Sequence, residues 1–180
     1  MIVSARAMDR LGQRGDHEFM TSLTSGVLIA AALTTGWVAG VLGHYAHTVM
    51  PALRRVDDRT FVTAFQAIDR AILNPWFMVA FFGAPVLALA ATVLVWGEGG
   101  ALRIWLLVAA VLLVASVVLT MAVNVPLNDA IKAAGAPDRI RDLAAVRAAF
   151  DESRWATVNL VRTIATVAAF GILVGAVAAA

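Results

Sequence analysis

Polar side chains that can transfer a proton or bind an anion stand at the ends of long apolar runs in this chain. His44 and His47 follow the first run, and Arg162 lies about two turns inside the fourth. A histidine can act as a general base near neutral pH, and an arginine can stabilise an oxyanion. These residue types favour proton abstraction from a hydrophobic substrate. The residues expected to take part in catalysis are His44, His47, Asn124, Asn159 and Arg162.

A second set of polar and aromatic residues accompanies the first, and we expect it to bind the substrate. It consists of Gln66, Asp69, Asn74, Asn128 and Trp155. Because a charge inside the bilayer is costly, Arg162 should face the interior and pair with Asp69 or Asp129. The alternatives are structural. Arg162 could extend to the membrane interface, the histidines could bond backbone carbonyls, and the asparagines could cap helix ends around Pro126.

Metal and cofactor chemistry is restricted by the absence of cysteine, which excludes disulfides, iron–sulfur clusters and thiolate zinc sites. His44 and His47 are three residues apart, so they could share a metal ion, and Asp69 could complete a two-histidine, one-carboxylate set. No Glu-x-x-His pair occurs, so a ferritin-like di-iron bundle is not predicted. We expect no cofactor and no tightly bound metal, and we keep a metal-dependent oxidoreductase as an alternative.

The elements that carry these residues are indicated by the composition. Hydrophobic residues make up 61% of the 180-residue chain and charged residues 14%, against ~25% charged in an average soluble protein. Four apolar runs each have the ~20 residues that a helix needs to cross a bilayer. They cover residues 23–47, 74–96, 102–123 and 156–179. The sequence therefore predicts an all-α integral membrane four-helix bundle, formed as one domain by residues 21–180.

The segments between the runs carry weaker signals. Residues 57–73 place phenylalanine and isoleucine at helical spacing after a possible Asp57 or Asp58 cap, which predicts a short amphipathic helix between spans one and two. Residues 124–138 are expected to form a polar loop, and residues 139–155 an amphipathic helix. Residues 1–20 should form a polar tail, disordered or at the interface, and Met20 is a candidate start codon.

An up-and-down arrangement of the four spans brings the selected polar residues to one end of the bundle. At about 100° per residue, Gly36, Gly40, Gly43 and His47 fall on one arc of the first span. Small residues allow helices to approach closely, so His47 is expected to face the bundle. Trp155, Asn159 and Arg162 likewise form one stripe on the fourth span.

The orientation in the membrane is predicted from the basic residues. Segments 50–74 and 124–155 contain nine lysines and arginines, whereas the opposite side has four. The positive-inside rule therefore places both long segments in the cytoplasm, in what we expect to be a bacterial plasma membrane. The lipid bilayer and a hydrophobic aromatic small molecule are the expected partners. Nucleic acid is not, because no basic run is interleaved with aromatic residues.

Several segments resemble the anthrone oxygenase-like membrane family. They are VMPAL at 49–53, FQAIDRAILNPWF within 61–77, NVPLND at 124–129 and WATVNLVRT at 155–163. The resemblance extends over most of the chain from about Leu23, and its most specific parts are the NVPLN and W-x-x-x-N-x-x-R patterns. The positions that match the family pattern are Gln66, Asn74, Asn124, Pro126, Asn128, Trp155, Asn159 and Arg162. Asp69 stands where many relatives carry asparagine.

The resemblance implies a small four-span membrane protein that oxidises anthrones to anthraquinones, as some members do in aromatic polyketide pathways. In such a reaction His47 or His44 would remove an acidic C–H proton, and Arg162, Asn124 and Asn159 would stabilise the oxyanion. The resulting carbanion would react with dioxygen without a cofactor. The alternative from a different class is a non-catalytic protein that binds a lipid or quinone, or serves as an accessory subunit of a membrane complex.

Overall fold

The computed structural model describes the backbone of residues 2–98 and 100–179, and the side chains of residues 18–97 and 100–179. Every regular element in this part of the chain is a helix or a helical turn. In order, they are α1 (Ile2–His44), the π turn η1 (Tyr45–Val49), α2 (Met50–Leu53), α3 (Asp58–Ile72), α4 (Pro75–Leu94), the 3₁₀ turn η2 (Trp96–Glu98), α5 (Gly100–Leu119), the π turn η3 (Thr120–Asn124), α6 (Val125–Ala133), α7 (Leu143–Phe150) and α8 (Glu152–Ala179). The predicted all-helical fold is confirmed.

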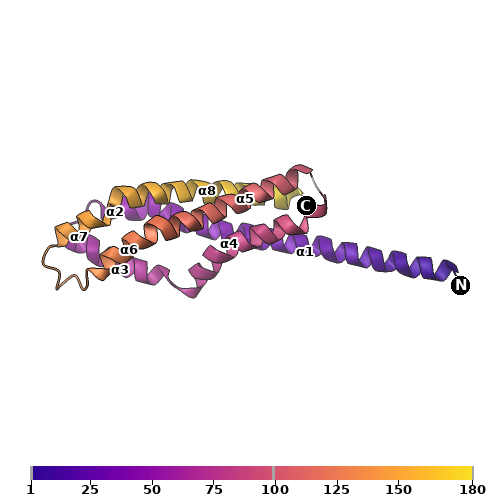
Figure 1. Ribbon diagram of the computed structural model, residues 1–180, viewed down its shortest axis with the longest axis horizontal. Helices are drawn as coiled ribbons and strands as arrows, with labels where there is room; N and C mark the ends of the chain where they lie inside the picture. The colour runs from indigo at the N-terminus through magenta and orange to yellow at the C-terminus, as the bar shows by residue number, and fades with distance from the viewer. Residues whose placement is uncertain (1, 99, 180) are drawn as a thin grey trace.

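Four helical stretches within the described residues are long and apolar enough to cross a bilayer. They are Glu18–Leu53, Pro75–Leu94, Gly100–Ala133 and Leu143–Ala179. Of their helices, α1 and α5 each pack against both α4 and α8, which makes a four-helix bundle (Figure 1). The helix α1 begins at Ile2, so the segment expected as a disordered or interfacial tail is helical and projects beyond the bundle (Figure 1).

The outer surface of the bundle is apolar on all four long helices. Leu33, Val86, Val111 and Val167 are each more than half exposed, one on each helix. A soluble monomer rarely exposes large contiguous apolar patches, whereas lipid chains cover such a surface without penalty. The fold and its surface together are those of an integral membrane protein.

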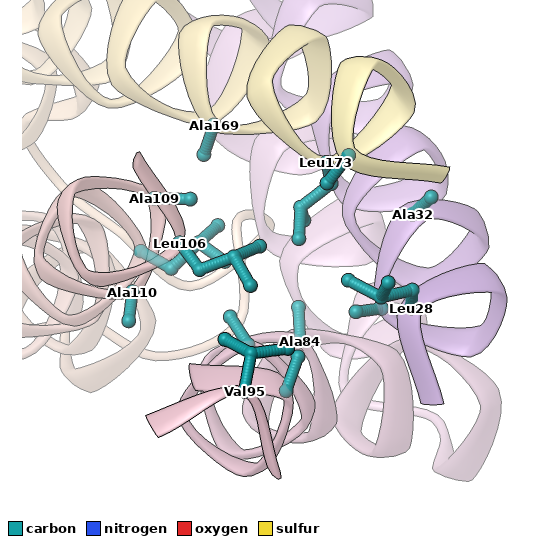
Figure 2. Close-up of a cluster of buried hydrophobic side chains, with 14 residues drawn as sticks. Leu28, Ala32, Ala84, Val95, Leu106, Ala109, Ala110, Ala169 and Leu173 are labelled. Carbon is teal, nitrogen blue, oxygen red and sulfur yellow. The ribbon is translucent and has the colours of Figure 1, made fainter. Parts of the chain in front are cut away.

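The bundle interior away from the selected polar residues is built from small side chains. Alanines from all four helices meet there with a few larger residues, among them Leu28, Val95, Leu106 and Leu173 (Figure 2). Alanine allows helix backbones to approach closely. In a membrane, where no water is displaced from the apolar surfaces, this close contact drives helix association. This half of the bundle is therefore held together by close contacts between its helices.

The predicted glycine arc on α1 is only partly correct. A Cβ atom on Gly36 would lie 2.8 Å from the ring of Phe170 on α8, so the missing side chain makes room for that ring. A Cβ on Gly43 would be 3.8 Å from Thr163, also on α8. Gly40 is exposed and has no neighbour within that range, so the arc lies at the edge of the α1–α8 contact rather than at the centre of the bundle.

Two of the spans continue through π turns into helices that were not expected. The prediction of a loop at 124–138 is wrong for its first half, because α6 occupies residues 125–133. Pro51 and Pro126 each stand two residues after a π turn, within the first turn of the next helix. Proline is tolerated there because its missing N–H has no intrahelical partner, and the wider turn before it relieves the clash with the preceding carbonyl.

The helices α2, α3, α6 and α7 form what we call the cap, at the end of the bundle opposite the α4–α5 turn (Figure 1). The amphipathic helix predicted after Asp57 is confirmed as α3. Asp57 caps it by accepting from the Thr60 N–H at 3.0 Å and from its hydroxyl at 2.7 Å. These two hydrogen bonds lower the pKa of the Asp57 carboxyl, and the bond from the Thr60 backbone N–H has the larger effect. The apolar face of α3 packs through Phe61 and Phe65 against Phe150 of α7.

Arg147 of α7 holds the cap together. Its guanidinium contacts Glu152 at 2.6 Å and Asp58 at 3.1 Å, and donates to the Val56 carbonyl at 2.8 Å. It also lies over the ring of Phe61, 4.4 Å from the centroid. Asp151, which has a φ of 50°, separates α7 from α8. The amphipathic helix predicted at residues 139–155 is therefore shorter, and residues 152–155 belong to α8.

We predict that Arg147→Leu lowers the free energy of unfolding by about 2 kcal/mol, because several charged hydrogen bonds lose their common donor. Thermal unfolding of the detergent-purified protein, followed by circular dichroism, measures this change. Arg141→Leu is the matched control, since Arg141 is exposed on the same connecting segment. Equal midpoints for the two variants would contradict the role assigned to Arg147.

Candidate functional site

A cavity of about 90 Å³ lies where the bundle meets the cap. Its polar lining consists of Asp69, Thr120, Asn124, Asn128, Asn159 and Arg162. Its aromatic lining consists of Tyr45, Phe65, Phe77, Phe81 and Trp155. Aliphatic side chains from α1, α3, the α3–α4 connection and α6 complete the wall. A few polar groups that converge in an apolar, concave site are typical of a small-molecule binding pocket.

Arg162 is the central charged group of this cavity. It is 4% exposed and lies on α8, where its Nη1 donates to the Thr120 hydroxyl at 2.6 Å and its Nη2 donates to the Asn159 Oδ1 at 2.7 Å. Its Nε has no partner in the described part of the chain. Both acceptors are neutral, so the positive charge is held in place without being neutralised.

The predicted ion pair between Arg162 and Asp69 or Asp129 is wrong. The Oδ2 of Asp69 lies 2.7 Å from the Lys132 Nζ, and Asp129 contacts the same ammonium at 3.0 Å. Lys132 lies on α6, which packs against α3, so it reaches Asp69 on α3 and Asp129 on its own helix. The expectation that Arg162 faces the bundle interior is confirmed by its burial, which also excludes extension to the membrane interface.

A chain of hydrogen bonds connects the Lys132–Asp69 pair to α8. Asn128 donates from Nδ2 to the Asp69 Oδ1 at 2.6 Å and accepts at Oδ1 from the Trp155 indole N–H at 2.7 Å. Trp155 is 4% exposed, and its ring centroid lies 6.0 Å from the Arg162 guanidinium carbon. The chain fixes the Asp69 carboxylate at the cavity wall and orients the indole ring beside it.

Asn124 and Asn159 line the cavity from two different helices. Asn159 donates from Nδ2 to the Leu42 carbonyl of α1 at 3.1 Å, so both atoms of its amide are bonded once Arg162 is included. Asn124, the last residue of η3, donates from Nδ2 to the Trp155 carbonyl at 3.3 Å. Its Oδ1 is buried and has no partner in the part of the chain that the structure describes.

Both π turns present a polar side chain to the cavity. Tyr45 is the first residue of η1 and Thr120 the first of η3, and each lines the site. The Tyr45 ring packs against Trp155 with centroids 5.8 Å apart. A π turn inserts a residue into the helix and so rotates the following side chains to a new face.

Of the predicted site residues, six come together at the cavity and four do not. Those that line it are Asp69, Asn124, Asn128, Trp155, Asn159 and Arg162. Gln66 instead ties α3 to the end of α6, because its Nε2 donates to the carbonyls of Ile131 at 2.8 Å and Gly135 at 3.0 Å. Asn74 caps α4 by accepting from the Phe77 N–H at 3.1 Å. Neither lines the cavity, so the structure gives both a positioning role.

The two histidines lie outside the cavity. His44 and His47 are both exposed, and their rings pack edge to face with centroids 5.8 Å apart. The prediction that His47 faces the bundle is wrong, because the glycine arc that His47 shares lies beside the buried face of α1, which includes Val38 and Leu42. Among the described residues, no three His, Asp or Glu side chains lie close enough to hold a metal ion, so the proposed His44–His47–Asp69 set does not form.

Sequence reasoning did not assign Tyr45, Lys132 or the aromatic wall of Phe65, Phe77 and Phe81 to the site. A signal for Tyr45 was present, because Tyr45 continues the helical spacing of Val38 and Leu42, which the structure buries in the bundle. Phe77 and Phe81 carry no comparable signal, since apolar residues line every face of α4, whereas Phe65 lies on the predicted apolar face of α3.

A sequence model of the family described as anthrone oxygenase matches residues 76–172. The matched segment runs from α4 into α8 and includes Asn124, Asn128, Trp155, Asn159 and Arg162. Comparison with curated proteins and comparison with solved structures find no match. The match covers more than half of the chain and contains most of the polar cavity lining, so this protein belongs to the anthrone oxygenase family.

Proposed function

We propose that this protein oxidises a flat, hydrophobic phenolic or polycyclic substrate with dioxygen in the cavity between bundle and cap. The observation that carries the proposal is the buried Arg162 guanidinium, which lines an apolar pocket and has only neutral hydrogen-bond partners among the described residues. Family membership supports the same reaction class.

An uncompensated cation inside a membrane bundle is costly, and such residues usually serve a function. Here Thr120 and Asn159 fix the guanidinium at the cavity wall, and no carboxylate of the described chain neutralises it. A phenolate or enolate oxygen that develops on a bound substrate would supply the missing negative charge. Because the donor is oriented before the reaction begins, it stabilises the oxyanion without reorganisation.

The shape and lining of the cavity favour a planar aromatic ligand. Tyr45, Phe77, Phe81 and Trp155 offer ring faces and edges that stack on such a ligand. A cavity of about 150 Å³ accommodates benzene, so a polycyclic substrate needs more room than the 90 Å³ present here. The wall formed by the corner between α3 and α4 faces the lipid, where Leu73 is 57% exposed. Movement of this corner would admit the substrate from the membrane.

Asp69 is the proton acceptor that the cavity offers in place of the histidines. In the proposed reaction, a methylene carbon next to the aromatic rings loses a proton to the Asp69 carboxylate. The electron pair moves onto the conjugated carbonyl oxygen, which Arg162 stabilises. Dioxygen then oxidises the carbanion. Overall, the methylene loses two hydrogens and becomes a carbonyl with one atom of dioxygen, and the other atom leaves as water.

We predict that Arg162→Gln lowers the turnover number for anthrone oxidation by about 10²–10³-fold, the usual effect of removing one oxyanion donor. Asp69→Asn should also reduce turnover, because the acceptor for the proton is lost. Oxygen consumption by the purified protein in lipid nanodiscs measures both effects, with empty nanodiscs reporting the spontaneous oxidation of anthrone.

The control for this experiment is His47→Ala, which should keep wild-type turnover because His47 lies outside the cavity. Each variant must retain the thermal midpoint of the wild type, which separates loss of catalysis from loss of folding. Wild-type rates equal to the empty-nanodisc background would rule out the proposed reaction. Tight binding of an aromatic ligand without oxygen uptake would instead favour the non-catalytic binding protein.

We also infer that the cap lies on the cytoplasmic side of a bacterial plasma membrane. Nine basic residues lie in the two segments that form the cap and its connections, against four at the other end of the bundle. Basic residues are retained on the cytoplasmic side during insertion. The reaction with dioxygen does not depend on this orientation. The orientation decides from which side of the membrane water-soluble molecules reach the cap.

This orientation predicts the labelling of single cysteines, which is unambiguous because the natural chain has none. In intact cells, a membrane-impermeant maleimide should label Gly97→Cys at once, and should label Arg139→Cys only after the membrane is permeabilised. Both positions are exposed in the structure. The reverse pattern would show that the cap faces outward.

A further inference from the structure

Apart from the Asp69 Oδ2, which the Lys132 ammonium contacts at 2.7 Å, two buried polar atoms in the cavity lining lack a partner within the described residues. They are of opposite type. One is the Nε of Arg162, a donor, and the other is the Oδ1 of Asn124, an acceptor. Arg162 is 4% exposed and Asn124 1%. A buried group left without a hydrogen bond costs about 1–3 kcal/mol, so an unpaired donor and acceptor in one cavity indicate a ligand that supplies the complements.

Asn124 differs in this respect from the other two asparagines of the cavity. Asn128 uses its Nδ2 on Asp69 and its Oδ1 on Trp155. Asn159 uses its Nδ2 on the Leu42 carbonyl and its Oδ1 on Arg162. Only Asn124 has a free acceptor among these three amides. The amide cannot turn round to offer its nitrogen, because Nδ2 donates to the Trp155 carbonyl, which is an acceptor only.

The position of Asn124 places this acceptor near the cationic group. Asn124 ends the η3 turn that Thr120 begins, and Thr120 accepts directly from Arg162. Asn124 is also bonded to the backbone of Trp155, whose ring lies beside the guanidinium. The same short stretch of chain thus offers a fixed positive charge and a fixed acceptor to one ligand.

We propose that Asn124 determines substrate specificity by accepting a hydrogen bond from a hydroxyl group of the substrate, while Arg162 binds an oxygen that carries the developing negative charge. This inference rests on the proposed function and deepens it. The preferred substrate has at least two oxygen groups, one that accepts or is anionic and one that donates. An aromatic ketone without a hydroxyl leaves the Asn124 oxygen unpaired and binds more weakly.

Binding without turnover tests this assignment. The probes are anthraquinones with a hydroxyl at position 1 or 2, the two corresponding methyl ethers, and unsubstituted anthraquinone, measured by quenching of tryptophan fluorescence in nanodiscs. The pH is kept mildly acidic so that the phenols are protonated. In the wild type, at least one hydroxyl compound should bind about tenfold more tightly than its ether, the value of one hydrogen bond to a buried acceptor.

Variants then assign the preference to one residue. Asn124→Leu removes the acceptor, so the hydroxyl compound and its methyl ether should bind with affinities within about twofold of each other. This ratio is unaffected by any change in affinity that the variant causes for all probes alike. Asn124→Asp keeps an acceptor at the same place and should keep the preference, which covers the case in which the leucine variant does not fold. Thr35→Val is the matched control, since Thr35 has another unpartnered buried oxygen but does not line the cavity.

The assignment is overturned if the wild type binds none of the probes, if it prefers neither hydroxyl compound over its ether, or if Asn124→Leu keeps the preference. Oxygen uptake is measured separately and distinguishes this failure from that of the proposed function. A hydroxyl preference without oxygen uptake would leave Asn124 as the specificity residue of a binding protein. Oxygen uptake without such a preference would refute the role of Asn124 alone.

Discussion

The burial of one positive charge on α8 organises the polar half of this bundle. Arg162 is 4% exposed, so its buried donors require acceptors within the protein. They obtain them from Thr120 of η3 and from Asn159, one turn earlier on α8 itself. These acceptors are themselves fixed, since Thr120 donates to the Ser116 carbonyl at 2.7 Å and Asn159 donates to the Leu42 carbonyl. The charge is thereby connected to α5 and α1, and the three helices are held in one register around the cavity.

The two π turns lie at the same level of the bundle as this network. Each lies two residues before a proline, so each spans the place where a straight helix would have clashed with the proline ring. Instead of ending the spans, the turns let them continue into the cap. Each begins at a residue that lines the cavity, Tyr45 in η1 and Thr120 in η3. Irregular helix geometry and the polar site therefore occur at the same level of the bundle.

The two halves of the molecule are stabilised by different forces. The half near the α4–α5 turn is packed through alanines, and close van der Waals contact replaces a hydrophobic driving force that lipid does not provide (Figure 2). The cap has large aromatic side chains and the Arg147 network, as is usual for structure in contact with water. The cavity lies at the boundary, where an apolar ligand from the membrane could meet polar groups anchored from the cap.

The sequence alone determined the membrane class, the four spans and the grouping of polar residues at one end, because span length and chain order depend only on local composition. It also identified Arg162 and its stripe on α8, since a charge in an apolar run has few stable environments. Only the tertiary structure decided the partners. Both Arg162 and Lys132 could have formed the ion pair with Asp69. Lys132 forms it because it lies on α6, a helix that the sequence did not predict because Pro126 stands in its first turn. His47 and Tyr45 are two residues apart, and the side of α1 that packs against the neighbouring helices decided which of them reaches the cavity.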